Sequence, residues 1–307
     1  MTRPLATVSV DVDPVDLHLL GYGIGGLAPD PLVYTASLPR LVERFNRTGV
    51  RATFFVVGRD AAAHAPALRA LEDAGHEVAS HSHSHPMPFV RVPRSRLDAE
   101  LLESRRQLED ATGRPVIGFR APNWDVSARA VASLVRAGYR YDASGFPTLL
   151  QIPARALLVM KAQDPRTALR MRPWPFTLRR QPFRWRVGGD EVYEFPISVT
   201  RWLGFPIYHT TRYLLPERLF IRHLDDFARR GQALFYPLHG VDALGLKEDR
   251  VDERLSRHPG MEHSLAHKLA LLERSLAAIA ERFEAITYRE HLARLEAAEG
   301  TRGRPDQ

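Results

Sequence analysis

The sequence predicts an α/β fold built on a parallel sheet, and three observations predict it. Strand-like and helix-like segments alternate through the first half of the chain, and the turns between them are short. Such alternation favours parallel strands that are joined by right-handed crossovers. The third observation is that polar residues gather where predicted strands end: Asp11, Asp13, His81, Arg120 and His239. Because enzymes of barrel type carry their sites at that edge of the sheet, the pattern points to an enzyme.

The first elements follow from local composition and spacing. The β-branched run LATVSVDVD (5–13) predicts a strand that ends in two aspartates. Residues 38–50 place apolar side chains on one helical face, and RATFFVVG (51–58) is typical of a buried strand. A second helix is predicted for residues 65–76, where Gly75 suits the C-cap.

The alternation continues through five further elements. EVASH (77–81) is the third predicted strand, and it ends at a row of histidines. A long helix follows over residues 93–113, and Gly113 again suits a cap. VIGFRAP (116–122) predicts the fourth strand. The last helix and strand of this part cover residues 127–139 and 140–144.

The alternation stops in an insert, at about residues 146–216, that is rich in proline, arginine and aromatic residues. Only one strand is predicted there, at 191–198. Nine Lys or Arg stand between Arg155 and Arg186 against a single acidic residue, and a solvated basic face is the plain interpretation of such a run. Regular structure resumes as helix, strand, helix and strand, at residues 216–231, 233–240, 264–283 and 284–288.

Composition limits the class of protein. With 307 residues and 44% hydrophobic content, the chain can bury a sizeable core. We expect one catalytic domain over residues 1–298 and a disordered tail over 299–307. Because the chain has no cysteine, a metal site would use His, Asp or Glu. The formal net charge of +7 favours an anionic partner.

Targeting signals are missing from the sequence. It has no run of about 18 uncharged apolar residues, the length that a transmembrane helix needs. The N-terminal segment also lacks the apolar region and cleavage site of a secretory signal. We therefore expect a cytoplasmic protein that is peripheral at the inner face of the membrane.

The segment GHEVASHSHSHP (75–86) carries the strongest metal signal. One helical turn would bring His81 and His85, four residues apart, to the same face, whereas His83 would point away. Imidazole suits a divalent transition metal, with zinc the usual one. A polar loop is the plain alternative. The aspartates, Arg-x-Pro and Leu-His at other strand ends favour the metal.

Four motifs together resemble those of the polysaccharide deacetylases, the NodB-homology group of carbohydrate esterases. They are SVDVDP, GHEVASHSHSH, FRAPNW and YPLHG, and the resemblance covers about residues 5–145 and 190–295. The Asp-x-Asp spacing of the first motif is similar to that of a subset of the family. The family's fourth motif commonly supplies an Asp and a Trp that line the site. Three residues of this chain are candidates for that part: Asp190, Glu191 and Glu194.

The resemblance implies a distorted, incomplete (β/α) barrel and one divalent metal ion, expected to be zinc. The implied metal ligands are Asp13, His81 and His85. Asp11 would be the general base, Arg120 would hold it as a carboxylate, and His239 would protonate the leaving amine. The expected substrate-binding residues are Tyr22, Pro122, Trp124 and Leu238.

Four other histidines are set apart from the site. His76 follows a predicted helix cap, so a structural role is expected for it. No carboxylate-bearing strand end accompanies the histidines near the C-terminal helix. A surface position is therefore predicted for His258, His263 and His267.

The leading hypothesis for function is hydrolysis of an amide-linked acyl group, acetyl or formyl, from an N-acylated sugar. The basic, aromatic insert suggests that the sugar is linked to a lipid or a nucleotide and that the protein contacts an anionic membrane. The expected anchors are Arg172, Trp174, Arg179, Arg180, Arg184, Trp185, Arg186 and Trp202.

Two alternatives stay open. One is the opening of a cyclic amide or imide by the same fold. The other is nucleic-acid binding through the insert. We do not expect a nucleic-acid partner, because the insert contains no recognised binding module and the polar strand ends would go unexplained.

Overall fold

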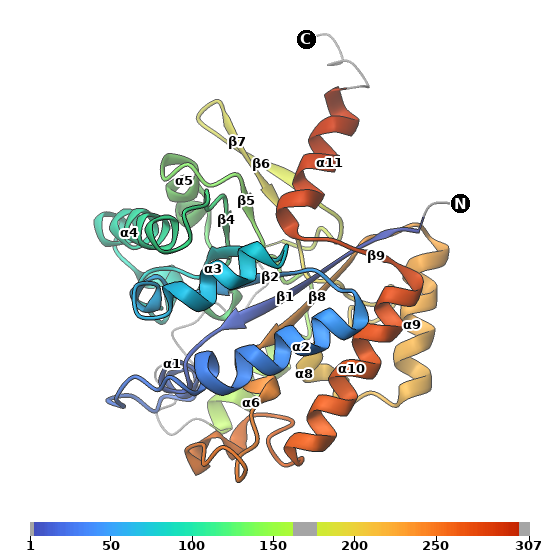
Figure 1. The fold of residues 1–307 in the computed structure, drawn as a ribbon. Helices are drawn as coiled ribbons and strands as arrows, with labels where there is room; N and C mark the ends of the chain where they lie inside the picture. The colour runs from blue at the N-terminus through green and yellow to red at the C-terminus, as the bar shows by residue number, and fades with distance from the viewer. Residues whose placement is uncertain (1–2, 162–176, 301–307) are drawn as a thin grey trace.

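The computed structural model describes residues 3–161 and 177–300 of the chain. Its centre is one curled sheet in the order β6-β7-β5-β4-β3-β2-β1-β8, with β9 paired to β1 (Figure 1). Every pair is parallel except the β6–β7 hairpin. The strands are β1 (Leu5–Val12), β2 (Ala52–Val56), β3 (Glu77–Ser80), β4 (Gly118–Phe119), β5 (Tyr141–Asp142), β6 (Phe183–Val187), β7 (Asp190–Glu194), β8 (Leu234–His239) and β9 (Glu284–Ala285).

The two ends of the curled sheet approach each other without pairing as strands. The backbone N–H of Ser198, in the segment after β7, donates to the carbonyl of Phe235 in β8 at 3.3 Å. The backbone N–H of Phe235 donates in turn to the Oγ of Ser198 at 2.9 Å. The predicted distorted, incomplete (β/α) barrel is therefore confirmed.

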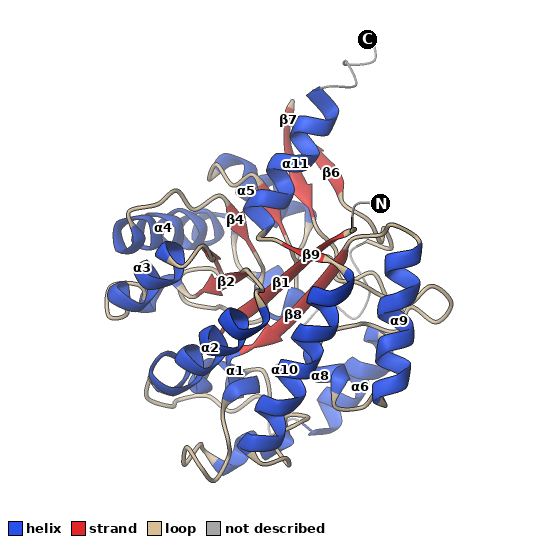
Figure 2. Ribbon diagram, turned by 45° about the vertical axis from the view of Figure 1, so that its right-hand side comes forward, coloured by secondary structure: helices blue, strands red, loops and turns tan. Residues whose placement is uncertain are grey.

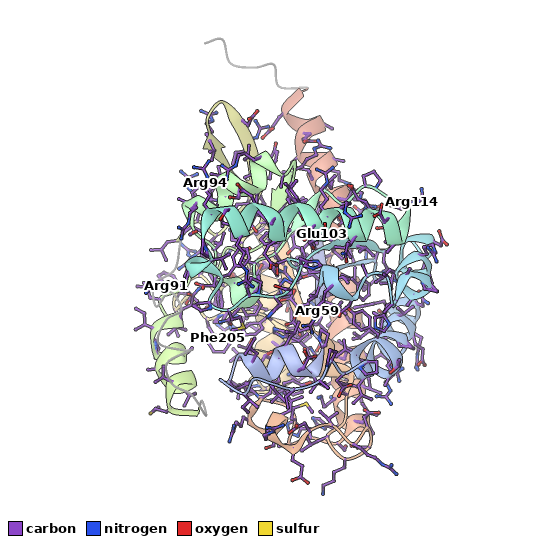
Figure 3. All side chains as sticks on the ribbon, turned by 90° about the vertical axis from the view of Figure 1, so that its left-hand side faces the viewer. Arg59, Arg91, Arg94, Glu103, Arg114 and Phe205 are labelled. Atoms are coloured by element: carbon purple, nitrogen blue, oxygen red, sulfur yellow. The ribbon has the colours of Figure 1, made fainter. Side chains whose placement is uncertain are left out.

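Most helices cover the outer face of this sheet, while the others lie near the ends of the strands (Figure 2). In Figure 3, α4 crosses the front of the molecule from Arg94 and ends just before Arg114. The outer helices are α2 (Leu38–Thr48), α3 (Ala65–Asp73), α4 (Arg94–Thr112), α5 (Ala128–Arg136), α9 (Glu217–Arg229) and α10 (Leu265–Arg282). The others are α1 (Val15–Leu20), α6 (Gln151–Lys161), α8 (His209–Arg212) and α11 (Tyr288–Gly300).

Side-chain alternation along the strands separates an outer core from an inner one. Leu234, Tyr236 and Leu238 of β8 belong to the large cluster beneath the helices. The intervening Phe235 instead joins a smaller cluster inside the curl, which Tyr288 of α11 completes. Because successive strand residues face opposite sides, the odd-numbered residues of β1 and β8 face the interior, where the site forms.

The insert holds more regular structure than predicted. The strand expected at residues 191–198 is β7, and it is preceded by β6 and by helix α6, which were not predicted. The signal for the hairpin is the Gly188–Gly189 turn, where both residues have positive φ, at 61° and 96°. A Gly-Gly pair between two β-rich runs is a recognised hairpin signal.

The C-terminal region also differs. The strand expected at 284–288 is only two residues long, because Tyr288 begins α11. Residues 299–300, expected to belong to a disordered tail, end this helix, and residues 301–307 lie outside the described part. Among the described residues, no helix has both the length and the apolar character needed to cross a membrane.

Candidate metal centre and active site

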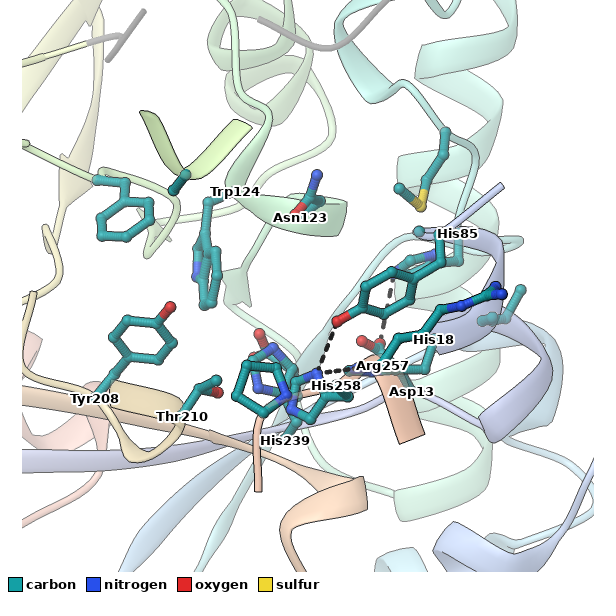
Figure 4. A pocket seen from close by; sticks show the side chains of 18 of the residues that line it. Asp13, His18, His85, Asn123, Trp124, Tyr208, Thr210, His239, Arg257 and His258 are labelled. Atoms are coloured by element: carbon teal, nitrogen blue, oxygen red, sulfur yellow. Dashed lines mark hydrogen bonds and ion pairs between the residues drawn. The ribbon is translucent and has the colours of Figure 1, made fainter. Parts of the chain in front are cut away.

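A pocket of about 290 Å³ opens at the carboxyl ends of β1, β3, β4 and β8. Its size lies near the lower end of the range for small-molecule sites, about 300–1,000 Å³. Figure 4 shows Trp124 and Tyr208 on one side and His18 and His85 on the other. Asp11, Asp13, Tyr22, His239 and Arg257 are also in its lining.

Three side chains that could hold a metal ion meet beside this pocket. Asp13 lies just beyond β1, while His81 and His85 follow β3, and all three are buried. One ligand atom from each lies within 4.8 Å of the others. The Oδ1 of Asp13 is 3.2 Å from Nε2 of His81 and 3.5 Å from Nε2 of His85. These three atoms have no hydrogen-bond partner among the described residues.

The second ring nitrogen of His81 shows why this group suits a cation. Nδ1 lies 2.8 Å from the carbonyl oxygen of Arg120, which can only accept, so Nδ1 carries the ring proton. In the neutral ring Nε2 then presents its lone pair to the carboxylate of Asp13. Two buried acceptors 3.2 Å apart repel each other unless a cation lies between them. Two imidazoles and one carboxylate, with the fourth position open, form a donor set that suits catalytic zinc.

The loop that presents the histidines is not the helical turn that the spacing predicted. Ser82 and His85 have left-handed φ angles of 66° and 53°, so the chain bends twice within five residues. The backbone N–H and Oγ of Ser84 both donate to the Glu100 carboxylate of α4, at 2.8 and 2.6 Å, and hold this loop. His83 lies outside the group of converging ligand atoms.

Asp11 is held by a buried arginine. Its Oδ1 accepts from Nη1 of Arg120 at 2.6 Å. The guanidinium is fixed from other sides, since Nε donates to the Ala143 carbonyl at 2.9 Å and Nη2 donates to the Tyr288 hydroxyl at 3.2 Å. It also lies over the Phe55 ring, 4.0 Å from its centroid. Burial lowers the pKa of Arg120, but the charge of Asp11, the hydrogen bond to it and two nearby tyrosine hydroxyls together raise that pKa above its ordinary value, so the guanidinium stays charged.

His239 ends β8 and faces the same pocket. Its backbone N–H donates to Oδ2 of Asp242 at 2.8 Å, which fixes the turn that follows the strand. Its ring packs edge-on against Trp124 and His18, with centroids 5.5 and 5.4 Å apart. The imidazole is thus held by aromatic contacts, and no carboxylate in the described part of the chain is bonded to its ring.

A second group of polar rings lies beside His239 and was missed from the sequence. Nδ1 of His258 is 3.0 Å from Nε2 of His18 and 3.2 Å from the hydroxyl of Tyr22. Burial lowers the pKa of His18 to about 4 and that of His258 well below its ordinary value, so both rings are neutral near pH 7. The surface prediction for His258 was wrong, because this residue is only 6% exposed. His263 is half-buried and His267 is exposed.

The three candidates for the family's fourth motif lie outside the pocket lining, and one of them, Glu194, contacts an acidic residue that was not among them. Asp190 and Glu191 are exposed on the β6–β7 hairpin. Glu194 is fully buried and hydrogen-bonded to Asp142, at the end of β5. Burial raises the pKa of Asp142 to about 6, and burial together with the Asp142 charge raises that of Glu194 well above its ordinary value. The signal for Asp142 was its place at a strand end, RYDAS.

The four expected substrate-binding residues fall into two pairs. Tyr22 and Trp124 line the pocket. Pro122 and Leu238 are buried and are absent from its lining, and Leu238 faces the outer core because it alternates with His239. The structural role expected for His76 is confirmed, since its Nδ1 accepts from the backbone N–H of Ala52 at 3.1 Å.

The insert anchors are not equivalent. Trp185 is half-buried, and its Nε1 donates to Oε2 of Glu194 at 3.0 Å, so it is a structural residue rather than an exposed anchor. Arg184 and Arg186 both form ion pairs with Glu191. Trp202, by contrast, is 83% exposed. Arg172 and Trp174 lie outside the described residues.

Part of the chain is similar in sequence to known proteins. The polysaccharide deacetylase family model matches residues 29–141, which include His81, His85 and Arg120. A peptidoglycan deacetylase from Helicobacter pylori is 32% identical over 145 residues, which make up 46% of this chain and 49% of that protein. The chain therefore matches about half the length of this curated relative.

Solved structures resemble nearly the whole chain. One is described as a "putative polysaccharide deacetylase from Mycobacterium smegmatis", with a TM-score of 0.61 and 19% identity over 97% of this chain and 92% of the other. PuuE allantoinase follows, with a TM-score of 0.57 and 17% identity over 99% of this chain and 92% of the other. At these identities the likeness shows the fold alone.

Proposed function

We propose that the chain is a metal-dependent hydrolase of the polysaccharide deacetylase type, which removes an acetyl group from the nitrogen of an amino sugar; the family model and the peptidoglycan deacetylase from Helicobacter pylori, which each match part of the chain, support this. One observation carries the proposal. Three ligand atoms without hydrogen-bond partners among the described residues, a carboxylate held by arginine and the imidazole of His239 gather at one pocket. Such a set supplies a metal, a base and an acid, which amide hydrolysis needs together.

The metal would be held by Asp13, His81 and His85, and zinc is the ion that this donor set suits best. When bound there, it would polarise the acyl carbonyl and make a nearby water more acidic. The Nδ1–H bond of His81 to the Arg120 carbonyl would keep the Nε2 lone pair directed at the ion.

Asp11 is proposed as the general base. It is only 3% exposed, and it lies two residues before the ligand Asp13 in the same pocket lining. Its bond to Arg120 stabilises the carboxylate through Oδ1 and leaves the second oxygen, Oδ2, without a hydrogen-bond partner among the described residues, so that Oδ2 can accept a proton from the attacking water.

His239 is proposed as the general acid. The amine of an amide is a poor leaving group until its nitrogen is protonated, so a donor is needed on that side of the scissile bond. His239 enters from β8, whereas the ligands come from β1 and β3. Trp124, packed edge-on against it, would hold its orientation and offer an apolar wall to the sugar ring.

A finer part of the proposal concerns the carrier of the sugar. The insert presents exposed apolar side chains that we call the insert face: Leu149, Leu150, Leu157, Met160, Leu178, Trp202 and Leu203. Leu157 of α6 belongs to this face and also lines the pocket. A lipid attached to the sugar would therefore leave the pocket along α6, and the insert face would enter the surface of a membrane.

Basic side chains beside the insert face suggest that this membrane is anionic. Nη1 of Arg180 donates to the carbonyl of Arg201 at 2.7 Å, which joins the segment at 178–180 to the one at 201–203. The guanidinium of Arg201 lies 4.8 Å from the centroid of the Trp202 ring. Within the described residues, neither Arg180 nor Arg201 forms an ion pair with an acidic side chain.

The function is tested by product analysis of the metal-loaded protein. Purified protein is analysed for bound metal and then assayed for acetate and formate release from a panel of N-acyl amino sugars. Acetate release that depends on the metal supports the proposal, and formate release would change the acyl group. Ring opening of cyclic amides without acid release would favour the alternative activity instead.

A further inference from the structure

We propose that the pocket contains a subsite for an anionic, phosphoryl-type substituent of the substrate, formed by Arg257 with His258, at a distance from the reacting amide. This inference rests on the proposed function, because it names the chemistry of the sugar that the same pocket takes. The inference goes beyond the proposed function because it assigns a role to the 3₁₀ turn Glu253–Arg257 and the residue after it. This segment carries none of the family motifs.

The two walls of the pocket differ in chemistry. One is aromatic and apolar, with Trp124, Phe146 and Tyr208 in contact with one another and Leu157 of α6 nearby in the lining. The other is polar, with the rings of α1 and the segment at 257–259. In Figure 4, Arg257 lies on the side of His18 and His85, across the pocket from Tyr208 and Thr210. A ligand that is apolar at one end and anionic at the other fits this division.

Arg257 is the one lysine or arginine in the lining of this pocket as the structure describes it. Its Nη1 is buried without a hydrogen-bond acceptor, and no ion pair is formed by this guanidinium with any described carboxylate. A buried cationic donor without an acceptor is costly, so such a group gains more from an incoming anion than a solvated one does. Arg254, on the same turn, is already paired with Asp252 at 2.6 Å.

His258 adds a second donor beside this guanidinium. Its Nδ1 is approached by the Tyr22 hydroxyl and by Nε2 of His18, and we assign the single lone pair of Nδ1 as the acceptor of the proton on Nε2 of His18, the nearer group. The ring proton of the neutral imidazole then lies on Nε2, which is buried and has no partner in the described structure. His258 is 6% exposed and lines the pocket, so an acceptor oxygen of the ligand would satisfy it.

The charges of the pocket leave Arg257 available. The carboxylate of Asp11 is matched by Arg120 at 2.6 Å. The carboxylate of Asp13 belongs to the group of metal ligands. Neither needs Arg257 as its counter-charge, and a bound divalent ion would add positive charge to the same pocket. An anionic substituent is therefore favoured over a neutral one, and the fork of a guanidinium matches phosphoryl oxygens.

The test compares two ligands that differ by one phosphate, N-acetylglucosamine and N-acetylglucosamine 1-phosphate. Their binding is measured by calorimetry on protein stripped of metal by chelation, so that the phosphate cannot bind to the ion. The phosphorylated sugar should bind about ten- to hundred-fold more tightly, as expected for a hydrogen bond to a charged group. Arg257→Gln should remove this preference, Arg257→Lys should keep part of it, and Arg254→Gln should leave it unchanged.

The inference and the proposed function can fail separately. Equal affinity for both ligands in the parent protein, or a preference that survives in a folded Arg257→Gln variant, would overturn the subsite; thermal melting establishes that the variant folds. A preference that depends on Arg257 supports it even if no acyl group is released. A nucleoside diphosphate sugar and a short polyprenyl diphosphate sugar, compared in the same way, separate the two carriers of such a phosphate.

Discussion

Each proposed metal ligand contributes one atom to the site, so substitution of one residue at a time can test which residues bind the metal. His81 and His85 each present an Nε2 toward Oδ1 of Asp13, whereas His83 lies outside the group. We predict that His81→Ala and His85→Ala lose most of the bound metal, and that His83→Ala keeps it. Metal per chain, measured by plasma mass spectrometry after dialysis, checks this. Similar losses in all three variants would contradict the assignment.

Asp11 offers a second test at the same scale. Asp11→Asn keeps the shape of the side chain and an oxygen that can accept from Arg120, but it removes the basic carboxylate. Because general acid–base groups typically contribute about 10²- to 10⁴-fold to rate, we expect a loss of that order in kcat with the metal content unchanged. Metal analysis and acetate release are measured on the same preparation. Near-normal kcat would mean that another group activates the water.

The identities of these residues could be predicted from the sequence, but their geometry could not. The motifs named Asp11, Asp13, His81 and His85; the structure places Asp11, Asp13 and His85 in the pocket lining and brings His81 beside Asp13 and His85. The helical turn expected for the histidines is instead a loop with left-handed residues, which spacing alone does not reveal. His258 was missed because a residue far along the chain reaches the pocket only through tertiary packing.

At the scale of elements, two buried carboxyl groups lie where β5 and β7 meet. Asp142 and Glu194 are buried and hydrogen-bonded to each other, and burial raises the pKa of Asp142 to about 6 and that of Glu194 well above its ordinary value. The folded protein therefore binds protons that the unfolded chain releases with carboxyl pKa values of about 4. The resulting stabilisation is complete below about pH 4 and is lost as the pH rises through 6 and beyond.

We predict that Asp142→Asn flattens this dependence. The amide can accept from Ser144 as the carboxylate does, and its N–H₂ can donate to Glu194 without a shared proton. Relative to the parent protein, the free energy of unfolding should improve from pH 5 to pH 8 by on the order of 1–3 kcal/mol. Urea denaturation of metal-free protein at several pH values measures it. Glu191→Gln, on the exposed part of the same hairpin, is the control and should not reproduce the effect.

The elements that sequence analysis missed share a physical cause. The strands and outer helices were predicted because one face of each packs on a core, which leaves a clear apolar period. Helix α6 has one side in the pocket lining and another exposed, so its sequence carries no such contrast. Strand β6 is an edge strand with alternating arginines, and only its Gly-Gly turn marks it.

At the scale of the whole molecule, the proposed membrane contact places one face of the protein against a lipid surface. The insert face is apolar, and Arg179, Arg180 and Arg201 lie in the segments that form it. Arg184 and Arg186, expected from the sequence to serve as anchors, are occupied by Glu191. Among the described residues, Arg179, Arg180 and Arg201 thus form no ion pair with an acidic side chain, whereas Arg184 and Arg186 do.

We predict that the protein co-sediments with vesicles that contain phosphatidylglycerol, less so at high salt, and little with purely neutral vesicles. Each basic residue near an anionic surface contributes about 1 kcal/mol, so the triple variant Arg179→Gln, Arg180→Gln, Arg201→Gln should weaken binding by roughly two orders of magnitude. Arg184→Gln with Arg186→Gln should weaken it much less, because Glu191 already offsets those charges.

The contribution of exposed apolar side chains to membrane binding is tested with a separate variant and its control. Trp202 and Leu203 are 83% and 80% exposed on the insert face, whereas Leu102 is 53% exposed on α4, away from the insert. Trp202→Gln with Leu203→Gln should reduce vesicle binding, because burying these side chains in the headgroup region supplies the hydrophobic part of the free energy. Leu102→Gln should leave binding unchanged. If the parent protein does not bind phosphatidylglycerol vesicles even at low salt, the membrane contact is wrong; the substrate is then water-soluble, and the metal group at the strand ends is unaffected because it shares no residue with the insert face.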